Sequence, residues 1–111
     1  MSSDSGLPPP LAVRRALRDF GSHVQAWRKL RGLTQNQLAD RAGVDRKTIM
    51  RVERSDGAVG LEIVFRVLHA LGVLESVPKA VDPYETDVGR LRADDQLPRR
   101  VRPRDLRGSD G

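Results

Sequence analysis

The chain has 111 residues, of which 38% are hydrophobic and only four are aromatic. This length suits one compact domain, and a core made of Leu, Val, Ile and Ala favours small packed helices over a β-sandwich. No cysteine is present, which excludes disulfides and zinc sites built on thiolates. No apolar run approaches the roughly 18 residues of a membrane span, so we expect no contact with a membrane.

Positive charge gathers in the middle of the chain. Residues 11–73 hold 12 basic and 6 acidic residues, whereas residues 74–111 hold 8 of each. A basic domain suits a polyanionic partner, although a basic surface that only keeps a protein soluble gives the same count. Because the polar, proline-rich start does not resemble a signal sequence, we expect a cytoplasmic protein.

The chain begins with a segment that is unlike a helix. Residues 1–10 predict a flexible N-terminal arm, because their consecutive prolines lack amide donors. From Leu11 to Leu30 apolar residues recur three or four apart, which predicts a first helix. Gly21 is a weak point in this helix.

Two short helices are predicted next, at about 35–42 and 46–54. Thr34 and Gln37 can form a capping box at the start of one, and the Asp45 carboxylate can cap the other. Glycines that follow predicted helix ends, at positions 32, 43 and 72, fit left-handed C-terminal caps. The fold class is therefore all-α, with four to five helices in a domain over residues 11–81.

The last predicted helices precede a tail. Residues 61–71 carry a single apolar stripe, which predicts the most buried helix. Leu74, Val77 and Val81 extend the pattern as a short fifth helix. Residues 82–111, rich in Arg and Pro, are expected to be a C-terminal tail.

Helices 35–42 and 46–54, joined by a short turn that contains Gly43, form a predicted helix-turn-helix. At about 100° per residue, one arc of the second helix is basic and the opposite arc, with Ile49 and Val52, is apolar. Such a helix can pack on its domain and present long donors to base edges in the major groove. The expected base-reading residues on the basic arc are Arg46, Lys47, Met50 and Arg51. A solvated charged face is the alternative for this arc.

The sequence resembles the Cro and lambda-repressor type, or XRE, family of helix-turn-helix proteins. The resemblance rests on the stretch from Val24 to Gln35 (VQAWRKLRGLTQ), on Leu38-Ala39, Ala42-Gly43-Val44, Thr48-Ile49 and Val52-Glu53, and on Leu61, Val64, Leu68 and Ala70-Leu71-Gly72-Val73. It implies a Cro/lambda-repressor-like fold, and a sequence-specific regulator that binds double-stranded DNA, as a repressor on an inverted repeat. It also implies a homodimer.

The resemblance carries over to individual positions. Gln35 matches a glutamine that bonds a DNA phosphate, and the other expected phosphate contacts are Thr34, Asp45, Thr48 and Arg54. Arg28 and Glu53 match a pair that in some members forms a buried ion pair. Where this chain has Arg and Lys as readers, several phage members have glutamines or serines, so the operator sequence does not carry over.

Two further surfaces stay open at the sequence level. Leu74, Val77 and Val81 form a dimer patch, or they fold back on the monomer core. Five arginines near the end of the chain form a DNA-binding arm, a solvated tail or a protein contact: Arg99, Arg100, Arg102, Arg104 and Arg107. The last option allows an alternative function, a HipB-like antitoxin that binds a toxin protein and autoregulates its operon.

No enzymatic site is predicted. Ser22 and His23 are neighbours on a helix, about 100° apart, and do not face each other. His23 and His69 lie far apart and lack the carboxylate spacing of a metal site. We therefore expect no catalytic residues, no metal and no cofactor.

Overall fold

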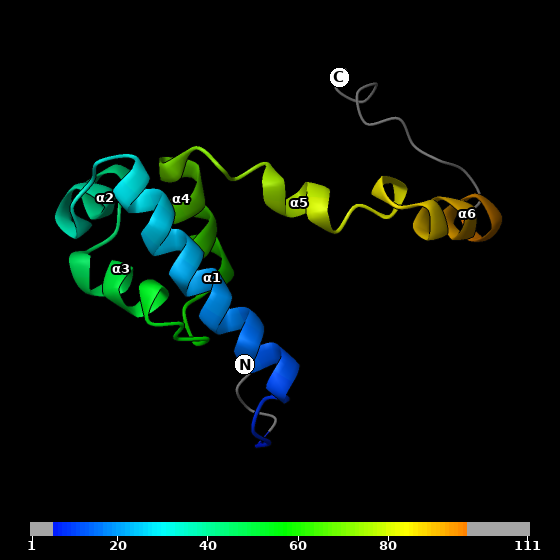
Figure 1. Cartoon of the computed structure of the whole chain (residues 1–111), viewed down its shortest axis with the longest axis horizontal. Coiled ribbons are helices and arrows are strands. Elements are labelled where there is room, and N and C mark those ends of the chain that lie inside the picture. The colour runs from blue at the N-terminus through cyan, green and yellow to red at the C-terminus, as the bar shows by residue number, and fades with distance from the viewer. Residues whose placement is uncertain (1–5, 98–111) are drawn as a thin grey trace. The chain divides into compact units, whose positions relative to one another are not determined.

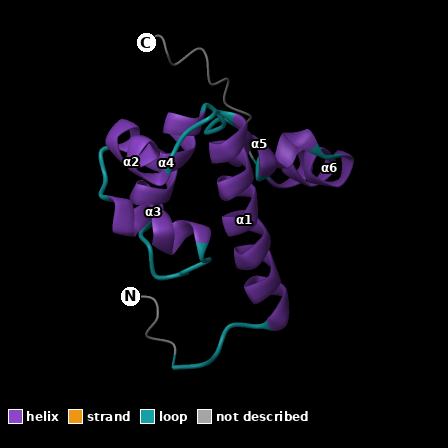
Figure 2. Ribbon diagram, turned by 60° about the vertical axis from the view of Figure 1, so that its left-hand side comes forward, coloured by secondary structure: helices purple, strands orange, loops and turns teal. Residues whose placement is uncertain are grey.

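Residues 6–97 are described by the computed structural model, and every regular element among them is helical (Figures 1 and 2). The chain divides into two units, Met1–Leu74 and Glu75–Gly111. The first unit contains α1 (Leu11–Leu30), α2 (Gln35–Ala42), α3 (Arg46–Glu53) and α4 (Leu61–Leu71). The second contains α5 (Ser76–Ala80), the 3-10 helix η2 (Pro83–Glu85) and α6 (Asp87–Gln96). The prediction of an all-α fold is confirmed.

The core of the first unit takes side chains from all four of its helices. Its most deeply buried members are Val24, Leu38, Ile49, Val67 and Leu71, each no more than 1% exposed. The pair α2 and α3 packs together, and each of the two also contacts another helix of the unit, α4 or α1. Burial of aliphatic side chains of this size contributes roughly 1.5–3 kcal/mol each, so the core holds the two short helices in place.

The glycines predicted to follow helix ends, Gly32, Gly43 and Gly72, all have a left-handed backbone. Gly43 and Gly72, with φ of 74° and 80°, are the left-handed C-caps of α2 and α4. The end of α4 is also tied to α1, because Arg31 Nε donates to the Leu71 carbonyl at 3.0 Å. The same guanidinium lies over the Trp27 ring, 5.0 Å from its centre. A cation at a helix C-terminus is favourable, so Arg31 joins the ends of α1 and α4.

Gly21, which the sequence marks as a weak point, lies where α1 approaches the end of α3. A Cβ atom there would meet the carbonyl oxygens of Glu53 and Val52 at 2.8 and 2.9 Å, and Ser55 Oγ at 2.7 Å. Real Cβ atoms do not come so close to backbone atoms. The absence of a side chain is thus what allows the two helices to approach.

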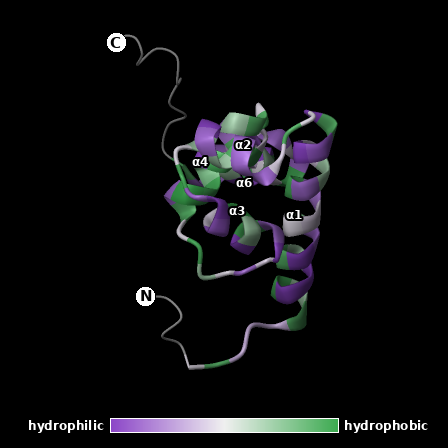
Figure 3. Cartoon of the chain, turned by 90° about the vertical axis from the view of Figure 1, so that its left-hand side faces the viewer, coloured by the Kyte–Doolittle hydropathy of each residue, from purple (hydrophilic) through white to green (hydrophobic). Residues whose placement is uncertain are grey.

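The first turns of α1 extend beyond the rest of the unit, as Figures 1 and 2 both show. Leu11 and Val13 there are 52% and 46% exposed. In Figure 3, hydrophilic and hydrophobic stretches alternate along α1, as expected for a helix that buries one side. After Gly21, Val24 and Arg28 are buried, whereas the residues of α1 before Gly21 are exposed or, at Leu17 and Phe20, half-buried.

The second unit departs from the predicted organisation. The first unit ends at Leu74 rather than near Val81, and residues 87–96 of the predicted tail form α6. This helix begins with a side-chain cap, since the Thr86 hydroxyl accepts a bond from the Gly89 amide at 2.9 Å. Its hydrophobic residues are Val88, Leu91 and Ala93, which are too few to mark a stripe, and of these only Ala93 is buried. Periodicity could not predict a helix that is specified mainly by its cap.

Candidate nucleic-acid interface

Helix α3 starts at a side-chain cap and a sharp turn. Asp45 Oδ1 accepts bonds from the Thr48 amide at 2.8 Å and from the Thr48 hydroxyl at 2.7 Å. The bond from the Thr48 side chain, followed by that from its amide, holds the pKa of Asp45 below its usual range. The carboxylate therefore stays ionised at neutral pH, where it favours the N-terminus of a helix.

This cap engages two of the residues expected at phosphates, Asp45 and Thr48. A carboxylate has no donor for a phosphate oxygen and repels its charge. Since both donors of Thr48 are also directed at Asp45, the structure gives the two side chains a role in starting α3. The sequence predicted the cap at Asp45, but it did not show that the cap competes with a phosphate contact.

The two faces of α3 differ as the helical wheel predicts. Ile49 is fully buried and Val52 is 4% exposed. On the opposite side Arg46, Lys47 and Arg51 are exposed, and Met50 is half-buried. Arg54 is also exposed, but it is the C-cap residue rather than part of the helix. The basic surface of α3 is thus opposite its apolar face, and the apolar face packs the helix against α1 and α2.

The first turn of α2 lies close to the end of α3. Thr34 and Gln37 form the predicted capping box, with bonds of 3.0 and 2.9 Å. Gln35 Nε2 donates to Glu53 Oε1 at 3.2 Å, and its side chain is half-buried. An amide nitrogen carries two donors, so the second N–H of Gln35 can serve another acceptor.

Glu53 connects three helices. Arg28 of α1 donates through Nε to Glu53 Oε2 at 2.6 Å and through Nη2 to Oε1 at 3.2 Å. The two side chains are 10% and 4% exposed. The third donor group of Arg28, Nη1, bonds the Leu33 carbonyl at 2.9 Å. The pair expected from the resemblance therefore forms a two-bond contact inside the first unit.

One contact of α3 has no counterpart in the sequence prediction. Arg51 Nε donates to Asp56 Oδ2 at 2.8 Å, and both side chains are partly exposed, at 44% and 37%. The two residues are five apart, which is not a helical spacing, and Asp56 lies in the turn after α3. Only the path of that turn, in which Ser55 has a φ of 67°, brings the two groups together.

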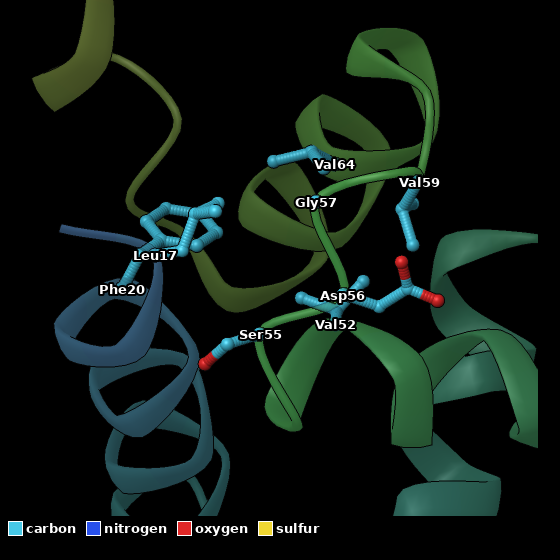
Figure 4. A pocket seen from close by; sticks show the side chains of 8 residues that line it. All are labelled: Leu17, Phe20, Val52, Ser55, Asp56, Gly57, Val59 and Val64. Carbon is cyan, nitrogen blue, oxygen red and sulfur yellow. The ribbon is translucent and has the colours of Figure 1, made fainter. Parts of the chain in front are cut away.

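Residues of this turn, Ser55, Asp56 and Gly57, also line a cavity of about 160 Å³. Its lining is mainly apolar and includes Leu17 and Phe20 of α1 and Val64 of α4. Figure 4 shows the carboxylate of Asp56 pointing away from Leu17 and Phe20. Asp56 therefore borders the cavity, while its carboxylate bonds Arg51 on the basic surface of α3.

Comparisons with known proteins agree with this arrangement. A family model described as helix-turn-helix matches residues 24–76. An uncharacterized HTH-type transcriptional regulator of Methanothermobacter thermautotrophicus is 41% identical over 49 residues, which cover 44% of this chain and 71% of that protein. The chain belongs to the XRE-type helix-turn-helix family. No solved structure matches it significantly.

Within this family fold, α2 and α3 are the helix-turn-helix and α3 is its second helix. The matched residues end in α5, so most of the second unit lies beyond them. Of the predicted dimer patch, Leu74 ends the first unit and is half-buried, while Val77 (half-buried) and Val81 (77% exposed) belong to the second. The predicted arginine cluster of residues 99–107 lies outside the described residues.

Neither a metal-binding cluster nor a membrane-spanning helix is found in residues 6–97. No group of three His, Asp or Glu side chains in this range could hold a metal ion. No helix in it combines the length and the apolar character needed to cross a membrane.

Proposed function

We propose that the chain is a transcriptional regulator that binds double-stranded DNA by placing α3 in the major groove. The observation that carries this proposal is the division of α3 into a buried apolar face and an exposed basic one on a helix-turn-helix. A helix fits the groove when one face is held by the domain and the other offers donors to base edges. The relative from Methanothermobacter is named as a transcriptional regulator, which supports the same function.

Four residues would contact bases in this arrangement. The guanidinium groups of Arg46 and Arg51 can each donate two bonds to guanine O6 and N7, and Lys47 can reach the same acceptors. Met50, half-buried beside them, would contact a thymine methyl group. Each good bidentate pair contributes roughly 1–3 kcal/mol of discrimination between bases.

Phosphate contacts would orient the domain. The N-terminus of α2 favours an anion, and Gln35 keeps one amide N–H for it while the other bonds Glu53. Thr34 lies at the same helix start, with a hydroxyl that accepts within the capping box and can still donate. Arg54, exposed at the end of α3, would contact the backbone on the other side of the groove.

We propose further that the protein acts as a dimer and a repressor on an inverted repeat. A helix-turn-helix monomer presents a short base-reading surface, and two-fold dimers place two such helices about one helical turn of DNA apart. Occupancy of a promoter by such a dimer blocks transcription. Sedimentation of wild type and of Val77→Asp tests the dimer contact: an unchanged dimer in the variant would remove Val77 from the interface.

The exposed apolar residues of the second unit favour a second candidate, a protein contact such as the one an antitoxin makes with its toxin. Val88 and Leu91 of α6 are 69% and 68% exposed, and residues 75–97 carry six acidic and three basic side chains. Such a segment suits a protein partner better than DNA. In a HipB-like antitoxin, DNA binding by α3 would serve autoregulation.

The experiment that tests the main proposal is selection of bound sequences from random duplex DNA, followed by a salt titration. The expected result is an inverted repeat whose enrichment is lost when Arg46, Lys47 and Arg51 are changed to Ala. Changing Arg14, Arg15 and Arg18 on the exposed start of α1 gives a control with the same loss of charge. Salt-sensitive binding without enrichment would show that α3 is a non-specific anchor.

A further inference from the structure

Asp56 holds the side chain of Arg51 from outside α3. Arg51 Nε donates to Asp56 Oδ2 at 2.8 Å. The other carboxylate oxygen, Oδ1, accepts from the Ala58 amide at 2.9 Å, and the Asp56 amide donates to the Arg51 carbonyl at 3.0 Å. Bonds within the turn thus hold the Asp56 carboxylate in place, and the carboxylate can therefore hold the Arg51 guanidinium in place.

We propose that Asp56 is a positioning residue that determines how Arg51 meets a base, an inference that rests on the proposed function of α3. A guanidinium can present two pairs of donors, Nε with Nη2 or Nη1 with Nη2. Asp56 occupies Nε, and within residues 6–97 neither Nη atom of Arg51 has a hydrogen-bond partner. The two Nη groups of the guanidinium therefore remain available, and these two donors match guanine O6 and N7.

The fixed geometry has a thermodynamic consequence. A free arginine side chain samples many rotamers and can bond a phosphate or several different bases. An arginine held at Nε gives up less rotamer freedom when it bonds guanine and reaches other acceptors less easily. Asp56 is therefore expected to raise selection for one base pair.

The same carboxylate lowers affinity for DNA in general. The hydrogen bond from Arg51, followed by that from the Ala58 amide, holds the pKa of Asp56 below its usual range. The group is thus ionised at neutral pH, and a negative charge beside the basic surface of α3 repels phosphates. Loss of this charge should strengthen binding to any sequence while it weakens discrimination, whereas a residue that only shapes the turn would weaken both.

The key variant is Asp56→Asn. Its carbonyl oxygen can still accept from the Ala58 amide, which keeps the turn, but its NH₂ group cannot accept from Arg51 Nε. Glu62→Gln is the matched control, because it removes one negative charge from an exposed ion pair with Arg66 on α4. Arg51→Ala and the double variant Arg51→Ala/Asp56→Asn complete a cycle.

The measurement is the ratio of affinities of the full chain for its selected sequence and for single-base variants of it, by fluorescence anisotropy. A ratio taken on one preparation does not depend on the fraction of folded protein. Arg51→Ala should lower the ratio at one base pair by about 5- to 150-fold, which is the contribution of a bidentate arginine–guanine pair. Asp56→Asn should lower it at the same base pair, and should bind random duplex more tightly than Glu62→Gln does.

The outcomes separate this inference from the proposed function. No further loss in the double variant relative to Arg51→Ala would support action through Arg51. If Arg51→Ala loses discrimination while Asp56→Asn keeps it, the positioning role is overturned and the proposed function stands. If the chain selects no sequence, or if Arg51→Ala leaves every base preference unchanged, the reading role of Arg51 fails, and the role of Asp56 fails with it.

Discussion

Replacement of Arg28 by Met should destabilise the first unit by about 3–5 kcal/mol, because it leaves a buried carboxylate without its cation. The side chain of Glu53 is 4% exposed and would keep only its bond from Gln35, a neutral donor. The Leu33 carbonyl would lose its bond from Nη1 as well. A unit of this size has a total stability of roughly 4–11 kcal/mol, so the loss is a large fraction of it.

Adding Glu53→Leu to Arg28→Met should reverse part of this loss. Arg28→Met/Glu53→Leu removes both charges, and apolar pairs of similar volume often equal or exceed a buried ion pair in stability. A deficit of about 1–3 kcal/mol should remain, since the buried Leu33 carbonyl still lacks its donor. The double variant should therefore be more stable than Arg28→Met.

Urea unfolding followed by far-ultraviolet circular dichroism measures these differences, provided that the dependence on urea is the same for all variants. Arg66→Met is the control: its ion pair with Glu62 is exposed, at 49% and 77%, and its loss should cost about 0.3–0.5 kcal/mol. A loss below about 1 kcal/mol in Arg28→Met would mean that water reaches Glu53. A double variant less stable than either single one would refute the account of the stranded charge.

Three further changes test the contacts around α3. Gly21→Ala should destabilise by about 1–3 kcal/mol in urea unfolding despite the better helix propensity of Ala, since the new Cβ meets the Glu53 carbonyl at 2.8 Å; exposed Ser22→Ala, the control, should change little. Asp45→Ala should lower the melting temperature at pH 7 and Asp45→Asn much less. Because the pKa of Asp45 is lowered in the folded protein from its ordinary 3.8, its contribution is present above that value and is lost as the pH falls through the folded pKa. Gln35→Ala should weaken binding to all DNA sequences alike, as anisotropy on selected and random duplexes can measure, and a change in base preference would contradict a phosphate contact.

Helices with strong apolar periodicity could be predicted from the sequence, and α6 could not. The stripe of residues 61–71 buries Leu68 and Leu71, because side chains three and four apart share one face, but Leu61 at its start is 68% exposed. Val67, which is not part of the predicted stripe, is fully buried. In α6 the only hydrophobic residues are Val88, Leu91 and Ala93, too few to mark a stripe, and Val88 and Leu91 remain exposed. Its start depends on a single local cap, which is common in turns as well as in helices.

The candidate interface also has a part that could be predicted from periodicity and a part that could not. The basic face of α3 follows from the spacing of Arg46, Lys47 and Arg51 along one helix. The partner of Arg51 does not, because Asp56 reaches it through a turn whose path depends on a positive φ at Ser55. Contacts within an element follow from its periodicity, whereas contacts across a turn need the turn itself.

The contacts of α3 are of two kinds: apolar contacts, which stabilise the helix, and hydrogen bonds, which fix its position. Ile49 and Val52 bury its apolar face, but apolar contacts are not directional and tolerate small shifts of a helix. Hydrogen bonds have narrow distances and angles, and they occur at both ends of α3: at Asp45 before it, at Glu53, which bonds side chains of α1 and α2, and at Asp56 after it. The proposed base readout would depend on donor positions at this same scale, so a buried ion pair that adds little net stability can still be required for it.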